Sequence, residues 1–325
     1  MAQEFRFIDV CAGIGGLRLP FEELGGACVF TSEIDAAARF TYSANFAKVG
    51  IATHGEIDTD IMRIGSTEPG AIPAHDLLLA GFPCQPFSHA GKKRGFDDIR
   101  GTIFFAIAEV IRAKRPRVVL LENVRGLKAH DKGHTLSRIL SVLRDELGYY
   151  VPEPRILNAR DFGLPQNRQR LFIVAIRDDI SDAQTFCWPT PTHEREELRV
   201  ADFLERDPDP VFTISDSLWR GHVARKQRNR EAGKGWGYQI FEGASTYVAT
   251  ISARYYKDGS EALIAQTDGQ NPRKLTPREV ARLQGFPEDF ILHPSRMQAY
   301  KQLGNAVPIN VIRALADSCR RFLVS

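Results

Sequence analysis

The chain has 325 residues, of which 43% are hydrophobic and 26% are charged, and it contains no low-complexity stretch. This composition excludes a disordered chain, a collagen and a coiled coil, and the length favours a large domain that carries a smaller one. Lys and Arg number 43 against 40 Asp and Glu, and this net charge of +3 is too small to indicate a nucleic-acid partner by itself.

The N-terminal segment and the cysteines indicate the cellular compartment. The first ten residues include an acidic residue and lack the apolar core of a signal peptide, and no apolar run approaches the ~20 residues that a membrane helix needs. The five cysteines are odd in number, widely spaced and free of any Cys-x-x-Cys pair, which argues against a disulfide framework or a zinc site. We therefore expect a cytoplasmic protein that binds no metal and does not span a membrane.

The first half of the chain alternates short apolar runs with helical patterns. We predict strands over residues 5–10, 27–33, 75–81, 117–123 and 170–176. We predict helices around residues 17–24, from Asp35, around 102–114 and over 134–147. Because this alternation is typical of a parallel sheet covered on both faces, the predicted fold class is α/β and Rossmann-like.

The alternation ends after residue 176. Residues 180–272 are rich in Pro, Gly, Asp and Arg, with only two short apolar runs, 246–252 and 261–266, that suit strands. Thr276 as N-cap and Pro277 at the first helical position predict a helix over 276–286, and a last helix runs from about 308 to 322. The predicted domains are a large one, 1–180 completed by 273–325, and an inserted smaller one, 181–272, mostly of strands and loops.

A glycine-rich turn, with Gly13, Gly15 and Gly16, joins the first strand to the first helix. Such a turn lets the backbone approach a ligand, but its spacing is not that of the G-x-G-x-x-G motif, and a bare tight turn explains it equally well. Glu33 ends the second strand, where its carboxylate can accept hydrogen bonds from ribose hydroxyls, and Asp60 is placed similarly. Together they suggest an adenosine-containing cofactor; the alternative is two solvated strand ends.

Three further motifs contain reactive or ionisable groups. Cys84 lies between two prolines just past the carboxyl end of a buried strand, where a cysteine suits a nucleophile. Glu122 ends the next apolar strand, and the segment around Arg168 and Arg170 puts two guanidiniums on one side; ordinary ion pairs are the alternative for all three. The other four cysteines are predicted to be buried fillers, namely Cys11, Cys28, Cys187 and Cys319.

Seven motifs occur in the order AGIGG, GFPCQPFS, GFDDIRGTIFF, LLENV, QNRQR, RKLTPREVARLQGFP and QLGNAV. With them the chain resembles the DNA (cytosine-5)-methyltransferase family, in particular the compact bacterial enzymes of restriction–modification systems. The resemblance covers essentially all residues except about 180–245. It implies transfer of a methyl group from S-adenosylmethionine to C5 of a cytosine that is flipped out of the DNA duplex.

The resemblance also assigns roles to residues. Cys84 matches the nucleophile that adds to C6, Glu122 matches the general acid at N3, and Arg170, with Arg168 behind it, would hold the ring oxygen and steady the Cys84 loop. The implied cofactor-binding positions are Cys11, Ala12, Gly13, Ile14, Gly16, Glu33, Ile34, Asp60, Ile61, Pro83, Ile103, Asn305 and Ala306.

Two of these positions depart from the family pattern. Cys11 and Ile34 stand where the family usually or often has aromatic residues, so stacking on the adenine should be weaker. Asp60 is preferred to Glu56 and Asp58 because it begins a D-I-x-x-I pattern. For the last motif the alternative is a corner between helices, with Gly304 near the end of one helix and Asn305 capping the next.

Residues 181–272 correspond to the target-recognition domain of the family. Residues 220–234 hold six basic residues and Glu231, a local charge of +5, for which a solvated basic helix is the alternative to phosphate contacts. Thr250, Ile251, Arg254 and Tyr255 are candidates for reading or supporting the site. The predicted DNA-binding residues are Gln85, Ser88, Arg225, Lys226, Arg228, Thr250, Arg254 and Tyr255.

We expect a monomer that acts on double-stranded DNA at the bacterial nucleoid, with a cognate restriction endonuclease for the same site. A tRNA cytosine-5 methyltransferase of the same family is the nearest alternative, and the arginine-rich insert disfavours it. A non-catalytic DNA-binding regulator is disfavoured by the intact set of Cys84, Glu122 and the two arginines. A thiol hydrolase with a Cys–His pair is disfavoured because no histidine lies in a supporting motif.

Overall fold

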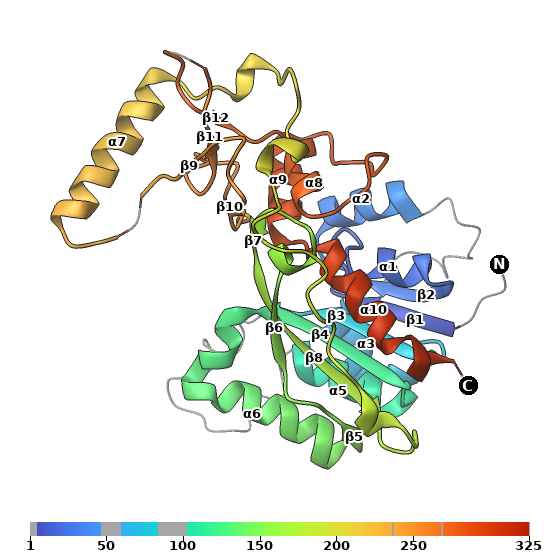
Figure 1. The fold of residues 1–325 in the computed structure, drawn as a ribbon. Helices are drawn as coiled ribbons and strands as arrows, with labels where there is room; N and C mark the ends of the chain where they lie inside the picture. Colours follow the sequence, from blue (N-terminus) through green and yellow to red (C-terminus); the bar gives the residue numbers. More distant parts are fainter. Residues whose placement is uncertain (1–4, 47–59, 84–102, 236, 268, 325) are drawn as a thin grey trace. The chain divides into compact units, whose positions relative to one another are not determined.

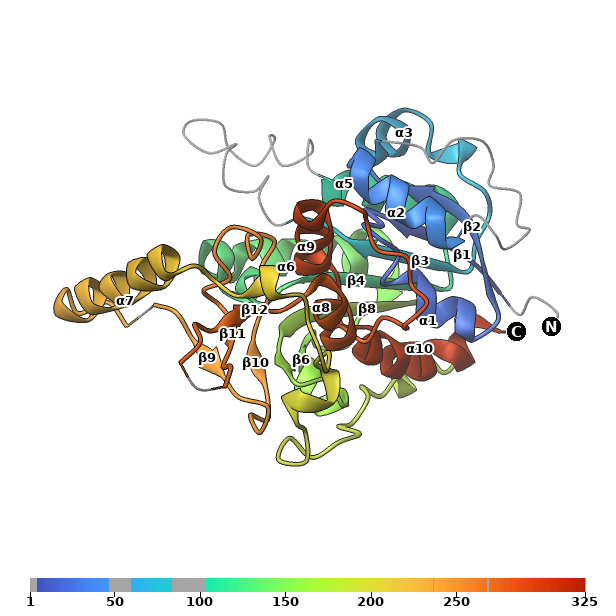
Figure 2. The ribbon, with the colours of Figure 1, turned by 90° about the horizontal axis from the view of Figure 1, so that it is seen from above.

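The computed structural model describes most of the chain (Figures 1 and 2), namely residues 5–46, 60–83, 103–235, 237–267 and 269–324. The chain forms two compact units. The first contains residues from 1–157, 169–190 and 312–325, and the second contains 158–168 and 191–311. The segments 158–168 and 273–311 thus group with the insert by their contacts. The predicted domains, which were divided where the alternation of strands and helices ends, stay a prediction.

The first unit is built on a seven-stranded sheet with the order β2-β1-β3-β4-β8-β5, in which β6 also pairs with β8. Neighbours among β2, β1, β3 and β4 are parallel, whereas β8 is antiparallel to both β4 and β5. The predicted parallel sheet is therefore correct for four strands and wrong at the β8 edge. A buried apolar run is the same in either chain direction, so the pattern of residues 170–176 does not reveal the reversal.

The main elements of the first unit follow in chain order. They are β1 (Phe5–Val10), α1 (Arg18–Glu23), β2 (Gly26–Ser32), α2 (Ala36–Phe46), α3 (Ile61–Thr67), β3 (Leu77–Gly81), α5 (Ile103–Lys114), β4 (Val118–Val124), α6 (His134–Ser141), β5 (Tyr149–Tyr150), β6 (Arg155–Asn158), β8 (Gln169–Arg177) and most of α10 (Ile309–Leu323). A single π-helical turn, Val142–Glu146, extends α6.

Alternate residues of the parallel strands pack against helices on opposite faces of the sheet. Ile8 of β1 belongs to a buried cluster that also includes side chains of α3, α5 and α6. On the other face the ring of Phe7 lies 6.3 Å from that of Phe21 on α1, and Arg313 of α10 pairs with Glu23 of α1 at 2.7 Å. Figure 1 accordingly shows α10 in front of the sheet and α5 behind it. With both faces covered, the carboxyl ends of the strands are the natural place for a ligand.

The second unit has helices joined by loops and very short strands. Its strands are β7 (Gln166–Asn167), β9 (Ile240–Phe241), β10 (Val248–Ala249), β11 (Leu263–Ile264) and β12 (Arg273–Lys274), and its helices are α7 (Asp216–Glu231), α8 (Pro277–Leu283), α9 (Arg296–Asn305) and the start of α10. β7 pairs with β10, and β11 pairs with β12 and β9.

Helix α7 is the one α-helix of the described part of the insert 181–272, which otherwise consists of short strands, single 3-10 turns and loops. It begins after Ser215, whose Oγ accepts a hydrogen bond from the N–H of Leu218 at 3.3 Å. The one buried residue of α7 is His222. The helix therefore lacks the buried apolar stripe by which a helix is usually predicted from sequence. The basic run therefore forms a helix, and its contact with DNA phosphates stays a prediction.

The corner between the last two helices also differs from its prediction. Gly304 lies near the end of α9, as predicted, but Asn305 is the last residue of α9. Helix α10 begins only at Ile309, after the segment 306–308, so Asn305 does not cap it.

In the part of the chain that the structure describes, no helix is both long enough and apolar enough to span a membrane.

Candidate active site

The glycine turn after β1 is bound to the end of β2 through the backbone. The N–H of Ala12 donates to the carbonyl of Ser32 at 3.1 Å, and the N–H of Gly13 donates to Oε2 of Glu33 at 2.8 Å. The other carboxylate oxygen, Oε1, accepts from the N–H of Asp35 at 2.8 Å. Two backbone donors thus fix the orientation of Glu33 at the carboxyl end of the sheet, and its contact with a ribose stays a prediction.

The turn adopts backbone angles that restrict its sequence. Gly15 has a φ of +87°, and a Cβ there would lie 2.2 Å from the ring of Phe46, so this position takes only glycine. Cys11 adopts a φ of +55°, which is uncommon for a residue with a side chain. Burial, followed by the nearby carboxylates of which Glu33 acts most strongly, raises the pKa of the Cys11 thiol to about 12. The raised pKa favours the neutral thiol over the nucleophilic thiolate at Cys11.

The surroundings of the turn fit an adenosine-containing cofactor. A Cβ built on Gly13 would meet no atom within 4 Å, so the described residues leave space above the turn. Ile34 is 69% exposed, the highest value among the large hydrophobic side chains that the structure describes. Asp60 caps α3, with Oδ1 accepting from the N–H of Met62 at 2.9 Å, and Ile61 is buried behind it.

The remaining predicted cofactor positions are distributed over both units. In the first unit Ala12, Ile14 and Gly16 are buried, Ile103 is half-buried at the start of α5, and Pro83 is exposed. Asn305, which is exposed, and Ala306, which is half-buried, belong to the second unit. Glu56 and Asp58, the competitors of Asp60, lie outside the described residues.

A buried polar network beneath the turn escaped the sequence analysis. Asp9 is fully buried, and burial raises the pKa of its carboxyl well above the usual range. The hydroxyl of Tyr42 donates to Asp9 Oδ2 at 3.4 Å and accepts from Nη1 of Arg18 at 3.1 Å. Arg18 also pairs with Glu22 at 2.6 Å. The available signal was a carboxylate between the apolar residues Ile8 and Val10 near the end of β1, since a buried carboxyl needs partners.

Glu122 and Arg170 meet at the carboxyl end of β4. Arg170 Nε lies 3.0 Å from Glu122 Oε1, and only 12% and 10% of the two side chains are exposed. Burial lowers the pKa of Arg170, and the charge of Glu122 opposes this shift. A Cβ built on Gly81 would lie 3.4 Å from Glu122 Oε2, so the carboxylate borders the end of β3. That strand leads to Cys84, which is outside the described residues.

Asn123, next to Glu122, was not predicted as a site residue. Its Nδ2 donates to the carbonyl of Phe82 at 2.7 Å, and its Oδ1 accepts from the N–H of Val124 at 2.8 Å. The side chain is buried. Asn123 therefore joins the end of β4 to the segment that immediately precedes Cys84, and a buried amide beside a site carboxylate is the signal that could have identified it.

Arg168 has an environment different from that of Arg170. Its side chain is fully buried within the second unit. Nη1 donates to the carbonyl of Ile251 at 2.9 Å, and Nη2 donates to the carbonyls of Gly304 and Ala306 at 2.7 and 2.6 Å. Its assignment as a catalytic residue beside the Cys84 loop stays a prediction, because that loop lies outside the described residues.

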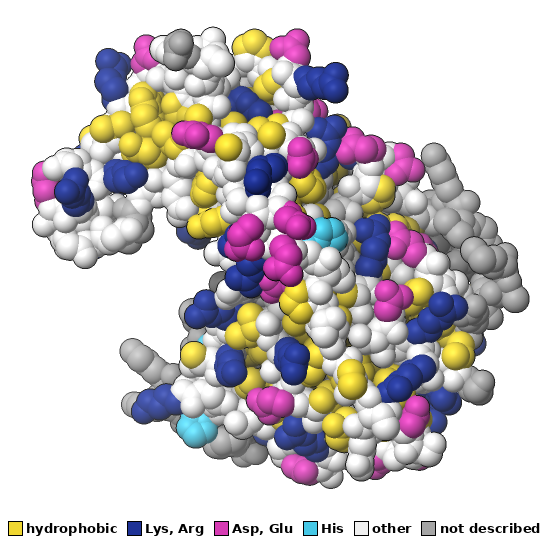
Figure 3. Space-filling model, viewed as in Figure 1, with side chains coloured by type: hydrophobic (Ala, Val, Ile, Leu, Met, Phe, Trp, Pro, Cys, Tyr) yellow, Lys and Arg dark blue, Asp and Glu magenta, His cyan; other side chains and the backbone are white. Residues whose placement is uncertain are grey.

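The predicted DNA-binding residues of α7 differ in how freely they are exposed. Figure 3 shows Lys and Arg side chains on the surface of this helix. Arg225 is paired with Asp258 at 3.0 Å, and the ammonium of Lys226 lies 4.2 Å from the centre of the Tyr238 ring. Arg228 is exposed. Of these three, Arg228 is the best suited to contact a phosphate, because the other two already serve the unit itself.

The structure describes only some of the other predicted DNA-binding residues. Gln85 and Ser88 lie outside the described residues. Arg254 is exposed, and the hydroxyl of Thr250 donates to the carbonyl of Asn167 at 2.5 Å.

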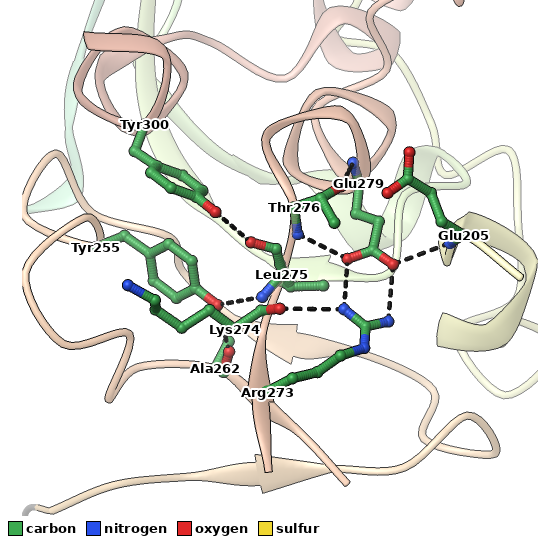
Figure 4. Close-up of polar contacts among 9 residues, drawn as sticks. All are labelled: Glu205, Tyr255, Ala262, Arg273, Lys274, Leu275, Thr276, Glu279 and Tyr300. Carbon is green, nitrogen blue, oxygen red and sulfur yellow. Dashed lines mark hydrogen bonds and ion pairs between the residues drawn. The ribbon is translucent and has the colours of Figure 1, made fainter. Parts of the chain in front are cut away.

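Tyr255 is fully buried. Its hydroxyl donates to the carbonyl of Ala262 at 2.6 Å and accepts from the N–H of Leu275 at 2.8 Å (Figure 4). Of the two predicted roles, the structure leaves Tyr255 the supporting one rather than that of reading a base.

Figure 4 also shows an ion pair at the start of α8 that the sequence did not reveal. Arg273 donates to both carboxylate oxygens of Glu279 at 2.8 Å, and both side chains are buried. Glu279 completes a capping box with Thr276, the predicted N-cap, and Pro277 is the first helical residue, as predicted. The N–H of Glu205 also donates to Glu279 at 2.9 Å. One carboxylate thereby connects three segments of the second unit.

The cysteines other than Cys84 are not all buried. Cys28 and Cys319 are buried, as predicted, and Cys11 is half-buried. Cys187 is exposed, so its prediction as a buried filler is wrong; it lies in an irregular segment between two residues that are less exposed. Within the described ranges, no group of three or more His, Cys, Asp or Glu residues is arranged to hold a metal ion.

Comparisons with known proteins agree on one family. The sequence model described as C-5 cytosine-specific DNA methylase matches residues 5–321. The Type II methyltransferase M.DsaV of Dactylococcopsis salina is 49% identical over 322 residues, covering 99% of this chain and 87% of that protein. The Type II methyltransferase M.NlaX of Neisseria lactamica is 51% identical, with 98% and 97% covered. The crystal structure of the S. pombe Dnmt2 methyltransferase has a similar fold, with a TM-score of 0.75, 22% identity, and 98% and 99% covered.

Proposed function

Because the chain belongs to the C-5 cytosine-specific DNA methylase family and is a Type II DNA cytosine-5 methyltransferase, we propose that it acts through a covalent bond between Cys84 and C6 of the target cytosine. The cytosine must be flipped out of double-stranded DNA, because neither C5 nor C6 can be reached inside the stack. The observation that carries the proposal is the buried pair of Glu122 and Arg170 at the end of β4, next to the strand that leads to Cys84.

Each catalytic side chain has a chemical task. C5 of cytosine is a poor nucleophile, so the thiolate of Cys84 first adds to C6 and shifts electron density to C5. Glu122, carrying a proton, hydrogen-bonds to N3 and stabilises that charge. Arg170 donates a hydrogen bond to O2, the carbonyl oxygen of the cytosine. After methyl transfer a base removes the proton from C5, and the thiolate leaves C6.

The resting ion pair prepares Glu122 for this task. Arg170 Nε contacts Glu122 Oε1 at 3.0 Å, so the two side chains hold each other at the end of β4. When the carbonyl oxygen O2 of the cytosine recruits the guanidinium of Arg170, the carboxyl group of Glu122 is released to hydrogen-bond to N3 of the same ring.

S-adenosylmethionine, when bound, supplies an electrophilic methyl group for attack by C5. We propose that Glu33 binds the ribose hydroxyls, Ile34 covers one face of the adenine, and Asp60 binds its amino group. The oriented carboxylate of Glu33 and the 69% exposure of Ile34 support this assignment. The turn from Cys11 to Gly16 would hold the methionine part, with Asn305 and Ala306 as further contacts.

The proposal includes the setting in which the enzyme acts. Residues 181–272 would recognise the target sequence, and the exposed basic residues of α7 support a contact with DNA phosphates. We further propose that the protein is a monomer in the bacterial cytoplasm, at the nucleoid, and that its methylation protects host DNA from a cognate restriction endonuclease.

The test is to express the protein in cells that lack cytosine methylation and to map 5-methylcytosine by bisulfite sequencing. Wild type should modify one cytosine in a fixed sequence, and Cys84→Ala should abolish the modification while the purified variant still binds S-adenosylhomocysteine. Cys187→Ala is the control, because this exposed cysteine should not affect activity. Methylation by Cys84→Ala would contradict the covalent mechanism, and activity confined to tRNA would contradict the choice of DNA.

A further inference from the structure

Arg168 joins two segments that are distant in the sequence. Its buried guanidinium donates to the carbonyl of Ile251 at 2.9 Å and to those of Gly304 and Ala306 at 2.7 and 2.6 Å. All four residues belong to the second unit. Hydrogen bonds from a cation are stronger than those between neutral groups, and a buried cation depends on keeping them.

The two segments also touch directly. A Cβ built on Gly304 would lie 2.4 Å from the backbone atoms of Ser252 and Ala253, which shows that the corner after α9 abuts the loop after β10. Gln166, on the strand that precedes Arg168, adds a second connection, because its Oε1 accepts from the N–H of Ile251 at 3.3 Å. A displacement of either segment would therefore be transmitted to the other.

These segments carry residues for which we proposed two different ligands. Thr250, a candidate DNA contact, directly precedes Ile251, and its hydroxyl binds the carbonyl of Asn167, next to Arg168. Asn305 and Ala306, the proposed cofactor contacts, immediately follow Gly304. One guanidinium thus binds the backbone of both ligand-contacting segments.

We propose that Arg168 is a positioning residue that couples cofactor binding to DNA binding, rather than a group that touches the cytosine. The inference rests on the proposed function, since it takes the two ligands from there. When the cofactor fixes the carbonyl of Ala306, the guanidinium and the carbonyl of Ile251 are fixed with it, and Thr250 is held in place for DNA. Linkage is reciprocal, so DNA must favour cofactor binding by the same factor.

The experiment measures this linkage in the full chain. The dissociation constant of a duplex that contains the sequence mapped by bisulfite is determined with and without saturating S-adenosylhomocysteine. Wild type should bind the duplex about tenfold more tightly with the ligand, within the usual range of coupling between sites. Arg168→Lys, which keeps the charge but not the planar fork, should reduce this factor to about twofold or less. The KM values for both substrates should rise together in this variant.

Arg273→Lys is the matched control. It makes the same change at another buried arginine of the second unit, one that contacts Glu279 and not the two segments. At a temperature where both variants are folded, Arg273→Lys should keep the wild-type factor. Should Arg168→Lys fail to fold, Gly304→Ala separates the same segments by adding a Cβ, and it should likewise lose the linkage.

Several results would overturn the inference. The first is a wild type whose DNA affinity does not change with S-adenosylhomocysteine. The second is an Arg168→Lys variant, or Gly304→Ala in its place, that keeps the full change in affinity. The third is an equal loss of this change in Arg273→Lys, which would mean that any damage to the unit has the same effect. A wild type that methylates no DNA would instead overturn the proposed function. The two failures are therefore distinguishable, because methylation and linkage are measured separately.

Discussion

The two compact units are stabilised in different ways. In the first unit, a seven-stranded sheet with both faces covered is held by backbone hydrogen bonds between its strands. The pairing of β4 with β8, for example, extends over seven residues, from Val118 to Val124. In the second, each strand has two residues, and buried polar side chains connect the segments. Arg168 and the pair of Arg273 and Glu279 are the main examples.

This difference affects where each unit tolerates substitution. A sheet distributes its stability over many backbone hydrogen bonds and apolar contacts, so one polar side chain at its edge can serve a ligand without holding the fold. A unit of short strands depends on a few buried charges, and removing one partner leaves the other uncompensated. The first unit should therefore separate stability from function, whereas in the second unit the two should be coupled at the buried polar side chains.

The largest effect is expected at Glu279. Glu279→Ala leaves Arg273 buried without its partner and removes the capping box of α8, so we expect a loss of about 3–5 kcal/mol in the free energy of unfolding. Glu23→Ala is the control, since it removes the exposed pair with Arg313 in the first unit, and it should cost less than about 1 kcal/mol. Urea denaturation followed by tryptophan fluorescence measures both. Equal losses would show that the units do not differ in this respect.

The same difference explains how far the sequence could predict the fold. The alternation of apolar runs and helical patterns predicts β1 to β4 and the helices α1, α2 and α5, because each strand is a short apolar run that precedes a helical pattern; α3 was not predicted. In the second unit the apolar runs 246–252 and 261–266 contain β10 and β11, but β7, β9, β12 and the basic helix α7 give no such pattern. The antiparallel direction of β8 was also missed, because an apolar run such as 170–176 is the same in either direction.

For the candidate site, motifs were more informative than periodicity. They identified Glu122 and Arg170, which the structure brings to 3.0 Å, and Glu33, which it orients against the glycine turn. They could not reveal that Tyr255 is buried or that Arg168 binds backbone carbonyls. Both facts depend on contacts between residues 7 to 138 positions apart in the sequence, which no local pattern contains.

Glu33 tests the first unit. Glu33→Ala removes a carboxylate that accepts from Gly13 and Asp35 and that we propose binds the ribose, so the dissociation constant for S-adenosylhomocysteine should rise about 10- to 100-fold. The midpoint of thermal unfolding without ligand should change little, because the sheet does not depend on this side chain. Calorimetry measures both quantities, with Glu109→Ala, an exposed carboxylate of α5, as the control. A large loss of stability would mean that function and fold are not separable in this unit either.

The smallest effect is expected on the exposed face of α7, where the second unit should tolerate change. Arg228→Gln should leave the free energy of unfolding within about 0.5 kcal/mol of wild type, because the side chain is exposed. If Arg228 contacts a phosphate, the slope of the logarithm of the DNA-binding constant against that of the salt concentration should become less steep by about 1. Arg225→Gln is the matched control on the same helix: since Arg225 is paired with Asp258, its loss should lower stability slightly and leave the salt slope unchanged. The reverse outcome, with a change of slope for Arg225 and none for Arg228, would show that the ion pair opens on DNA, so that pairing in the free protein does not identify the phosphate contacts.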